Sequence, residues 1–463
     1  MVTALIIIFI IGYLAIALEH PLRVDKTASA LLLGMLMWII YAMGAESIVP
    51  QVAGEKFAHF LQNHPELISS SKHMQALEYV LNVDIIEHLG DIMQTLLFLI
   101  GAMTIVEMID VHGGFRVITD RINTRNKVKL LWVIGLITFF MSAILDNLTT
   151  TIVMLMLLRK LITQKKERWL YAGAIVIAAN SGGAWSPIGD VTTIMLWVNG
   201  NVTAPTLLSY VLLPSLVSMI IPFIFVSRKL KGDLPPRDVV VETNSFITSG
   251  QRNAIFWLGV SGLIFVPIFK TFTHLPPFVG MLFVLGALWV FTEIFYNSKM
   301  LEQAKELRLP KVISRVDMPS ILFFLGILMA VAVLQSTGIL SATAQYLNDE
   351  IHNVTLISSV LGILSSVIDN VPLVAAAIGM YPIQSPDAVG YAANFMCDGM
   401  FWELMSFCAG VGGSILIIGS AAGVIAMGIE KISFGWYLKN FSWLAFVGYC
   451  CGIGVYIVEK LLF

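Results

Sequence analysis

The stretch Ser142-Ala-Ile-Leu-Asp-Asn-Leu-Thr-Thr-Thr151 places an acid and an amide, Asp146-Asn147, in the middle of an apolar run. A second stretch, Ser365-Ser-Val-Ile-Asp-Asn-Val-Pro372, carries Asp369-Asn370 in the same setting. A carboxylate at membrane depth is costly, so each aspartate is a candidate functional residue. The shared pattern predicts that the two Asp-Asn pairs are the two tips of one ion-binding site.

The composition predicts a membrane protein and not a set of soluble domains. Of the 463 residues, 57% are hydrophobic and only 13% are charged, whereas about a quarter of the residues in soluble domains are charged. The net charge of −2 gives no sign of a nucleic-acid partner. The four cysteines lack the spacing of a metal site, and we expect no cofactor. The expected fold is an all-α polytopic protein embedded in a lipid bilayer, with about 10 full spans.

Hydropathy predicts helices of roughly bilayer length along the whole chain. They lie near 2–19, 27–43, 89–111, 204–227, 253–270, 277–296, 319–338 and 440–460. We interpret 2–19 as a retained first span and not as a signal peptide, because Arg23 and Lys26 follow the apolar run instead of preceding it. The polar stretch 44–88 is expected to form an amphipathic helix on the membrane surface.

The two runs that carry the Asp-Asn pairs, 128–160 and 353–381, are expected to be re-entrant hairpins. Basic residues flank the first run at both ends, which places both ends on the cytoplasmic side. Acidic residues flank the second run, so we expect it to enter from outside. Glycines interrupt the apolar segments 168–199 and 399–428, which are therefore expected to be broken helices that line a site inside the protein.

These segments predict an internal inverted repeat. Leu145-Asp-Asn147 matches Ile368-Asp-Asn370 at an offset of 223 residues, and Gly182 matches Gly412 at an offset of 230. Each half has three spans, a hairpin, a broken span and a final span, and the halves start on opposite sides. Inverted repeats whose broken helices meet at mid-membrane are a secondary-transporter plan. The expected domains are 1–127 (first-repeat scaffold), 128–228 (first-repeat transport unit), 229–350 (cytoplasmic linker and second-repeat scaffold) and 351–463 (second-repeat transport unit).

Potential oxygen ligands gather in the hairpins and broken helices. Carboxylates, amide carbonyls and hydroxyls are hard ligands that suit Na⁺ or Li⁺ by the logic that governs Ca²⁺ and Mg²⁺. The expected ion-binding residues are Asp146, Asn147, Thr149, Asn180, Asp190, Thr193, Asp369, Asn370, Ser414 and Ser420. Because Asp190 aligns with Ser420, the main cation site is expected near Asp146, Asn147 and Asp190. For Ser414 and Ser420, packing of small residues between helices is an equal alternative.

A mechanism of ion exchange follows from such carboxylates. Burial favours the protonated form of a carboxyl group, so one aspartate can hold either a proton or a metal ion. Competition between H⁺ and Na⁺ for an aspartate that faces each side alternately is sufficient for antiport. Glu107 on the third span and Glu403 near the outer end of the second broken span are candidates for proton relay or pH sensing. An anionic substrate would meet two carboxylates, which disfavours an organic-acid carrier unless both are protonated.

With the Asp-Asn tips, the segment Asn180–Asp190 and Gly101-Ala-Met-Thr-Ile-Val-Glu107, the chain resembles the NhaD-type sodium/proton antiporters over nearly its whole length. Their superfamily also contains arsenite and dicarboxylate carriers. In the dicarboxylate carriers the hairpin tips read Ser-Asn-Thr, whereas here Asp146 and Asp369 stand at the Ser positions. The resemblance implies extrusion of Na⁺ and Li⁺ in exchange for protons across a bacterial inner membrane, important at alkaline pH and high sodium. It also implies a homodimer in which hairpins, broken spans and final spans move as a transport unit.

Other interpretations stay open. The chain could be a sodium-coupled dicarboxylate or other organic anion carrier, or an arsenite exporter, of the same superfamily. It could be an intramembrane aspartyl protease, although each aspartate here is followed by Asn and no water-activating motif accompanies it, so we expect no enzyme. It could be a channel, which would conduct passively without coupling to H⁺. Whether activity needs an ion gradient separates transport from enzyme activity.

Overall fold

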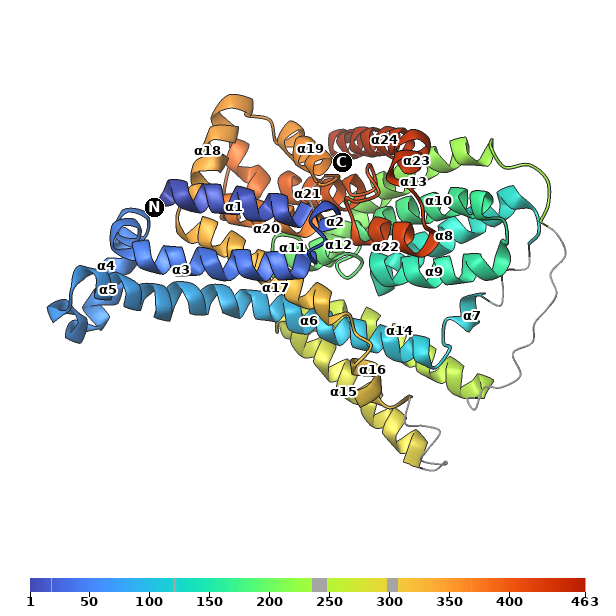
Figure 1. The fold of residues 1–463 in the computed structure, drawn as a ribbon, viewed down its shortest axis with the longest axis horizontal. Helices are drawn as coiled ribbons and strands as arrows, with labels where there is room; N and C mark the ends of the chain where they lie inside the picture. Colours follow the sequence, from blue (N-terminus) through green and yellow to red (C-terminus); the bar gives the residue numbers. More distant parts are fainter. Residues whose placement is uncertain are drawn as a thin grey trace. The chain divides into compact units, whose positions relative to one another are not determined.

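The computed structural model describes residues 1–17, 19–119, 122, 124–234, 248–297, 307–367 and 369–462. Parts of the expected linker (235–247 and 298–306) and Ile368 of the second tip lie outside the described residues. The described chain consists of helices and connecting loops, with no β-strand (Figure 1). Eight helical segments are long and apolar enough to cross a membrane. The structure therefore confirms the prediction of an all-α polytopic membrane protein.

The helices gather in two compact units, and the first comprises Met1–Leu96, Asp317–Asn353 and Val371–Ile383. Its elements are α1 (Val2–Ala17), α2 (Glu19–Leu22), α3 (Lys26–Val52), α4 (Gly54–Asn63), η1 (Pro65–Ser69), α5 (Lys72–Tyr79), the π-helical turn η2 (Val80–Asp84), the first part of α6 (Ile85–Val111), α17 (Met318–Ser336), α18 (Ile339–Ile351) and all but the first residue of α20 (Asn370–Met380).

The first unit is built on a close contact between α3 and α17. A Cβ atom at Gly34 would lie 2.4 Å from the carbonyl oxygen of Gly326, so both glycines are needed for the two backbones to meet. One helical turn away, the indole nitrogen of Trp38 donates a hydrogen bond of 3.0 Å to the carbonyl oxygen of Met329. Small residues and one buried hydrogen bond thus fix the register of the two helices.

Residues 44–88 differ from their prediction as a surface segment. Helix α3 continues to Val52, and a continuous helical segment runs from Lys72 to Val111. Buried Ile48 and Val49 extend the apolar face of α3, and buried Tyr79 and Val80 do the same before α6. The polar residues between them hid this helical periodicity in the sequence. The prediction is therefore wrong at both ends of the stretch, and α18 was not predicted.

The second unit comprises Leu97–Val316, Val354–Asn370 and Gln384–Phe463. Its elements are the last part of α6, α7 (Arg116–Thr119), α8 (Lys127–Leu145), α9 (Asn147–Leu161), α10 (Lys165–Gly183), α11 (Val191–Val198), α12 (Ala204–Thr206), η3 (Leu207–Val211), α13 (Leu212–Ser227), α14 (Ser249–Thr273), α15 (Pro277–Asn297), α16 (Leu309–Ile313), α19 (Val354–Leu364), η5 (Gly390–Phe395), α21 (Met400–Gly412), α22 (Ala421–Glu430), α23 (Phe434–Tyr437), η6 (Leu438–Ser442) and α24 (Trp443–Leu462).

The run 128–160 forms a helical hairpin. Helices α8 and α9 pack against each other, and the chain reverses between them at Asp146. Asp146 has φ 74°, which lies in the left-handed region that residues other than glycine seldom adopt. The turn thus falls at the Asp-Asn pair, as the sequence predicts.

The repeat is visible in matching hydrogen bonds. In the first half the hydroxyl of Ser142 donates to the carbonyl oxygen of Ala179 at 2.6 Å, which joins α8 to α10. In the second half the hydroxyl of Ser365 donates to the carbonyl oxygen of Ala409 at 2.8 Å, next to α19 and within α21. The donors are separated by the hairpin offset of 223 residues, and the acceptors by the broken-helix offset of 230. The two halves therefore dock hairpin on broken helix in the same way.

Candidate ion-binding site

Both broken helices lose helical geometry at the predicted places. Helix α10 ends at Gly183 and α11 begins at Val191, while α21 ends at Gly412 and α22 begins at Ala421. Each second helix has a side-chain cap: Oδ1 of Asp190 accepts from the backbone N–H of Thr192 at 3.1 Å, and Oγ of Ser420 accepts from that of Gly423 at 3.2 Å. The repeat thus places a carboxylate at one cap and a hydroxyl at the other.

Six buried polar side chains meet where the hairpin tips and the broken helices come together, and we call them the polar cluster. Each is no more than 5% exposed. They lie at the starts of α9 and α20, inside α10, and in or beside the two unwound segments. The members of the polar cluster are Asn147, Asn180, Asp190, Asn370, Ser414 and Ser420.

Asp190 is the acceptor for the amides of both hairpin tips. The Nδ2 atom of Asn147 donates to its Oδ2 at 2.6 Å. The Nδ2 atom of Asn370 lies 3.4 and 3.3 Å from its two carboxylate oxygens. One carboxylate therefore joins the two halves of the repeat.

Asn180 makes a second link between the halves. Its Oδ1 accepts from Nδ2 of Asn147 at 3.1 Å. Its own Nδ2 donates to the hydroxyl oxygens of Ser414, at 2.9 Å, and Ser420, at 2.8 Å. Ser414 and Ser420 are thus hydrogen-bonded members of the cluster as well as small residues that pack between helices.

The charge of Asp190 has no cationic counterpart among the described residues. Its side chain is 1% exposed, and within the described chain no Lys, Arg or His forms a salt bridge with it. Hydrogen bonds from amides and the positive end of the α11 dipole offset part of the cost of burying an anion. A buried carboxylate without an opposite charge is nevertheless unfavourable. The geometry therefore suits a carboxyl group that binds a cation or a proton.

Three of the predicted ligands act as helix caps in this structure. Asp146 accepts from the backbone N–H of Thr149 at 2.7 Å and from its hydroxyl at 3.0 Å, which caps α9. The hydroxyl of Thr193 donates to the carbonyl oxygen of Asp190 at 2.8 Å and closes a capping box on α11. Asp369 is half-buried directly before Asn370. The structure thus places Asp146 and Asp369 next to the cluster in sequence, with the adjacent amides reaching Asp190.

The two predicted relay residues lie elsewhere in the unit. Glu107 is half-buried on α6, and it is absent from the described hydrogen bonds that join the polar cluster. Glu403 is fully buried on α21, where Lys460 of α24 lies 2.9 Å from Oε2 and the hydroxyl of Tyr456 donates to the same oxygen. This ion pair gives Glu403 a structural partner, and proton relay by either residue stays a prediction.

The sequence argument missed Thr150. Its hydroxyl is fully buried and has no hydrogen-bond partner among the described residues. Thr150 follows Asn147 by three positions on α9, so the two side chains share a helix face. The run Thr149-Thr-Thr151 contained the signal, but the spacing to Asn147 identifies the middle threonine only once the helix start is known.

Comparison with known proteins gives consistent matches over nearly the whole chain. Residues 5–396 match the family described as "Citrate transporter". The chain is 41% identical to sodium/proton antiporter 1 of Arabidopsis thaliana, over 98% of this chain and 72% of that protein. It is 40% identical to sodium/proton antiporter 2 of the same plant, over 97% and 98% of the two chains. It is 30% identical to the Na⁺/H⁺ antiporter NhaD of Alkalimonas amylolytica, over 98% and 89%.

Proposed function

This chain belongs to the NhaD-type sodium/proton antiporters, and we propose that it exchanges cytoplasmic sodium ions for external protons across the membrane that it spans. The observation that carries the proposal is the buried carboxylate of Asp190, which has no cationic partner among the described side chains and accepts the amides of both tips. Such a group requires Na⁺ or H⁺ for neutralisation. Two ions that compete for one group, under alternating access, are coupled by that competition.

The residues around Asp190 can serve both states. A carboxamide carries an acceptor oxygen and a donor NH₂ group, so rotation of Asn147 or Asn370 exchanges a donor for a cation ligand. With a proton on Asp190, the amides remain hydrogen-bond partners. With Na⁺ present, amide oxygens, the carboxylate and the hydroxyl of Thr150 form a hard-ligand set. Asp146 and Asp369 add negative potential at the two tips, where helix N-termini would otherwise repel a cation.

Several finer features are part of the same proposal. Li⁺ is expected to replace Na⁺, because the ligand chemistry is the same. The hairpins, broken helices and final spans are expected to move as a transport unit with the proposed boundaries 128–228 and 351–463, on a scaffold and in a homodimer. A bacterial inner membrane stays a prediction, because the relatives come from a plant and from a bacterium. The family and relative names support a transporter and not an enzyme.

The second candidate function is a carrier for citrate or another organic anion. The description of the matching family favours it. The site disfavours it, because a carboxylate substrate would approach the buried charge of Asp190 and the acids of both tips. An arsenite exporter stays an alternative within the same superfamily.

Everted membrane vesicles with an imposed proton gradient and a fluorescent pH reporter test the proposal. Na⁺ and Li⁺ are expected to dissipate the gradient, while K⁺, citrate and succinate leave it intact. Asp190→Asn is expected to abolish the Na⁺ response, because the amide can neither be neutralised by Na⁺ nor exchange a proton. Asp387→Asn, at an exposed loop position, is the matched control and should respond like the parent protein.

Two outcomes would overturn the proposal. Silence of the parent protein to Na⁺ together with a response to citrate would favour the anion carrier. Full Na⁺ exchange by Asp190→Asn, present at the same amount in the membrane, would remove Asp190 from the mechanism.

A further inference from the structure

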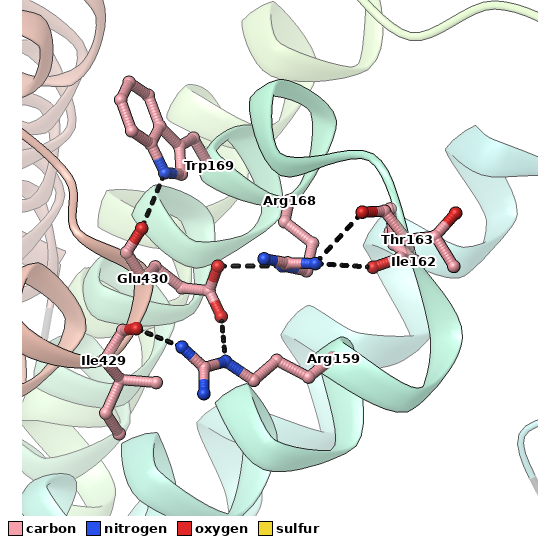
Figure 2. A network of polar contacts seen from close by, with 7 residues as sticks. All are labelled: Arg159, Ile162, Thr163, Arg168, Trp169, Ile429 and Glu430. Carbon is pink, nitrogen blue, oxygen red and sulfur yellow. Dashed lines mark hydrogen bonds and ion pairs between the residues drawn. The ribbon is translucent and has the colours of Figure 1, made fainter.

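A buried ionic cluster lies at the far ends of the helices that carry the polar cluster (Figure 2). Glu430 is the last residue of α22 and is 1% exposed. Its Oε1 atom lies 2.8 Å from Nε of Arg159 on α9, and its Oε2 atom lies 2.8 Å from Nε of Arg168 on α10. One carboxylate thus joins three helices that are distant in sequence.

Backbone contacts reinforce this cluster. The indole nitrogen of Trp169 donates to the carbonyl oxygen of Glu430 at 2.9 Å. The guanidinium of Arg168 also donates to the carbonyl oxygens of Ile162, at 3.1 Å, and Thr163, at 3.2 Å, which follow α9. Figure 2 shows these groups converging on Glu430 from both sides. The ends of α9 and α22 and the start of α10 are therefore held at one point.

The same three helices meet again at the ion-binding site. Helices α9, α10 and α22 pack against one another. Asn147 begins α9, Asn180 lies in α10, and Ser420 caps α22, and hydrogen bonds join these three residues. At a helical rise of about 1.5 Å per residue, the ionic cluster lies roughly 15–18 Å along the helices from the polar cluster. The three helices are thus linked at both ends.

We propose that Glu430 is a positioning residue, which sets the relative placement of α9, α10 and α22 and so fixes the distances among the ion ligands at their other ends. This inference rests on the proposed sodium/proton exchange. Two arginines around one buried carboxylate make the charge essential, because its removal leaves two guanidinium groups close together without an opposite charge. Supporting groups behind metal ligands typically change metal affinity about 10- to 100-fold.

The repeat supplies a contrast that supports this role. At an offset of 230 residues, Arg168 corresponds to Asp398. Asp398 accepts from the backbone N–H of Thr203 at 2.6 Å and from its hydroxyl at 2.8 Å, so a corresponding junction uses hydrogen bonds to a neutral residue. Position 168 and its equivalent therefore tie two broken helices together in both halves, and in the first half the link is ionic and includes the hairpin.

The test compares Glu430→Gln, Arg159→Gln and the double variant in everted vesicles. Glu430→Gln is expected to raise the Na⁺ concentration for half-maximal exchange about tenfold, with a smaller change in maximal rate. Arg159→Gln should raise it by less, and the double variant should be no worse than Glu430→Gln, because the same contact is lost. Glu430→Asp, which keeps the charge, should recover part of the affinity.

The control is Glu167→Gln, which removes a carboxylate from the Lys127–Glu167 pair (2.6 Å) between α8 and α10 and leaves Glu430 intact. It should leave the half-maximal Na⁺ concentration unchanged. Thermal unfolding of the purified single and double variants measures the Arg159–Glu430 coupling without transport. Unchanged Na⁺ dependence in Glu430→Gln, or additive losses of stability, would overturn the positioning role. Absence of exchange in the parent protein would instead overturn the proposed function, and the unfolding coupling would still decide whether the helices are tied.

Discussion

Asp146 carries two properties that one substitution can confuse, a negative charge and a helix cap. Its carboxylate accepts both hydrogen bonds from Thr149 that begin α9. Asn is also a good N-cap, so Asp146→Asn is expected to keep the thermal stability and severely weaken Na⁺/H⁺ exchange. Asp146→Ala loses the cap as well and should lower the stability by about 1 kcal/mol. Vesicle assays and thermal unfolding of both variants separate the two effects.

The contradicting result at this residue is clear in advance. Full exchange by Asp146→Asn would leave Asp146 a cap alone and assign the ion chemistry to Asp190. Equal stability of the Asn and Ala variants would show that the cap contributes little to folding.

The limits of sequence reasoning also show at single residues. A polar residue inside an apolar run is visible in sequence, so Asn147, Asp190 and Asn370 could be predicted. Sequence does not show which oxygen a helix cap consumes, so Asp146 and Thr193 were predicted as ligands although both cap helices here. Glu430 could not be predicted, because its arginine partners lie more than 250 residues away along the chain and no spacing rule joins them.

At the scale of elements, hairpin and broken helix can dock only where both backbones are bare. A Cβ atom at Gly182 would lie 2.2 Å from the carbonyl oxygen of Phe139, and one at Gly412 would lie 2.1 Å from that of Gly362. Gly182 and Gly412 are equivalent in the repeat, and so is their docking. The sequence therefore reveals this contact through the paired glycines, whereas the continuation of α3 to Val52 was hidden by polar residues.

Gly182→Ala and Gly412→Ala are each expected to destabilise the protein by about 1–3 kcal/mol, because backbone atoms must move apart. Gly428→Ala is the matched control, since Gly428 lies exposed on α22 and a Cβ atom there meets nothing within 4 Å. That control should gain up to about 1 kcal/mol from helix propensity. Thermal unfolding of the three purified variants makes the comparison. Loss of stability at Gly428 equal to that at Gly182 would show that the close contact is not the cause.

At the scale of the whole molecule, the two halves of the repeat are predicted to enter the membrane from opposite sides. The loop after the first hairpin is basic and should face the cytoplasm, while the loop after the second hairpin is acidic and should face outside. Exposed Gln164 and Ser385 mark these two loops. In a background without Cys397, Cys408, Cys450 and Cys451, single cysteines at the two positions can be labelled by a membrane-impermeant reagent.

Gln164→Cys is expected to react in everted vesicles and to be protected in right-side-out vesicles, and Ser385→Cys should show the reverse. A permeant reagent that labels both positions in both preparations is the control for accessibility. Reaction of both cysteines from the same side would contradict the inverted repeat, since two hairpins that enter from one side cannot present Asn147 and Asn370 to Asp190 from opposite directions. Labelling from opposite sides would place the buried carboxylate between two re-entrant tips, which is the geometry that alternating access to one ion-binding group requires.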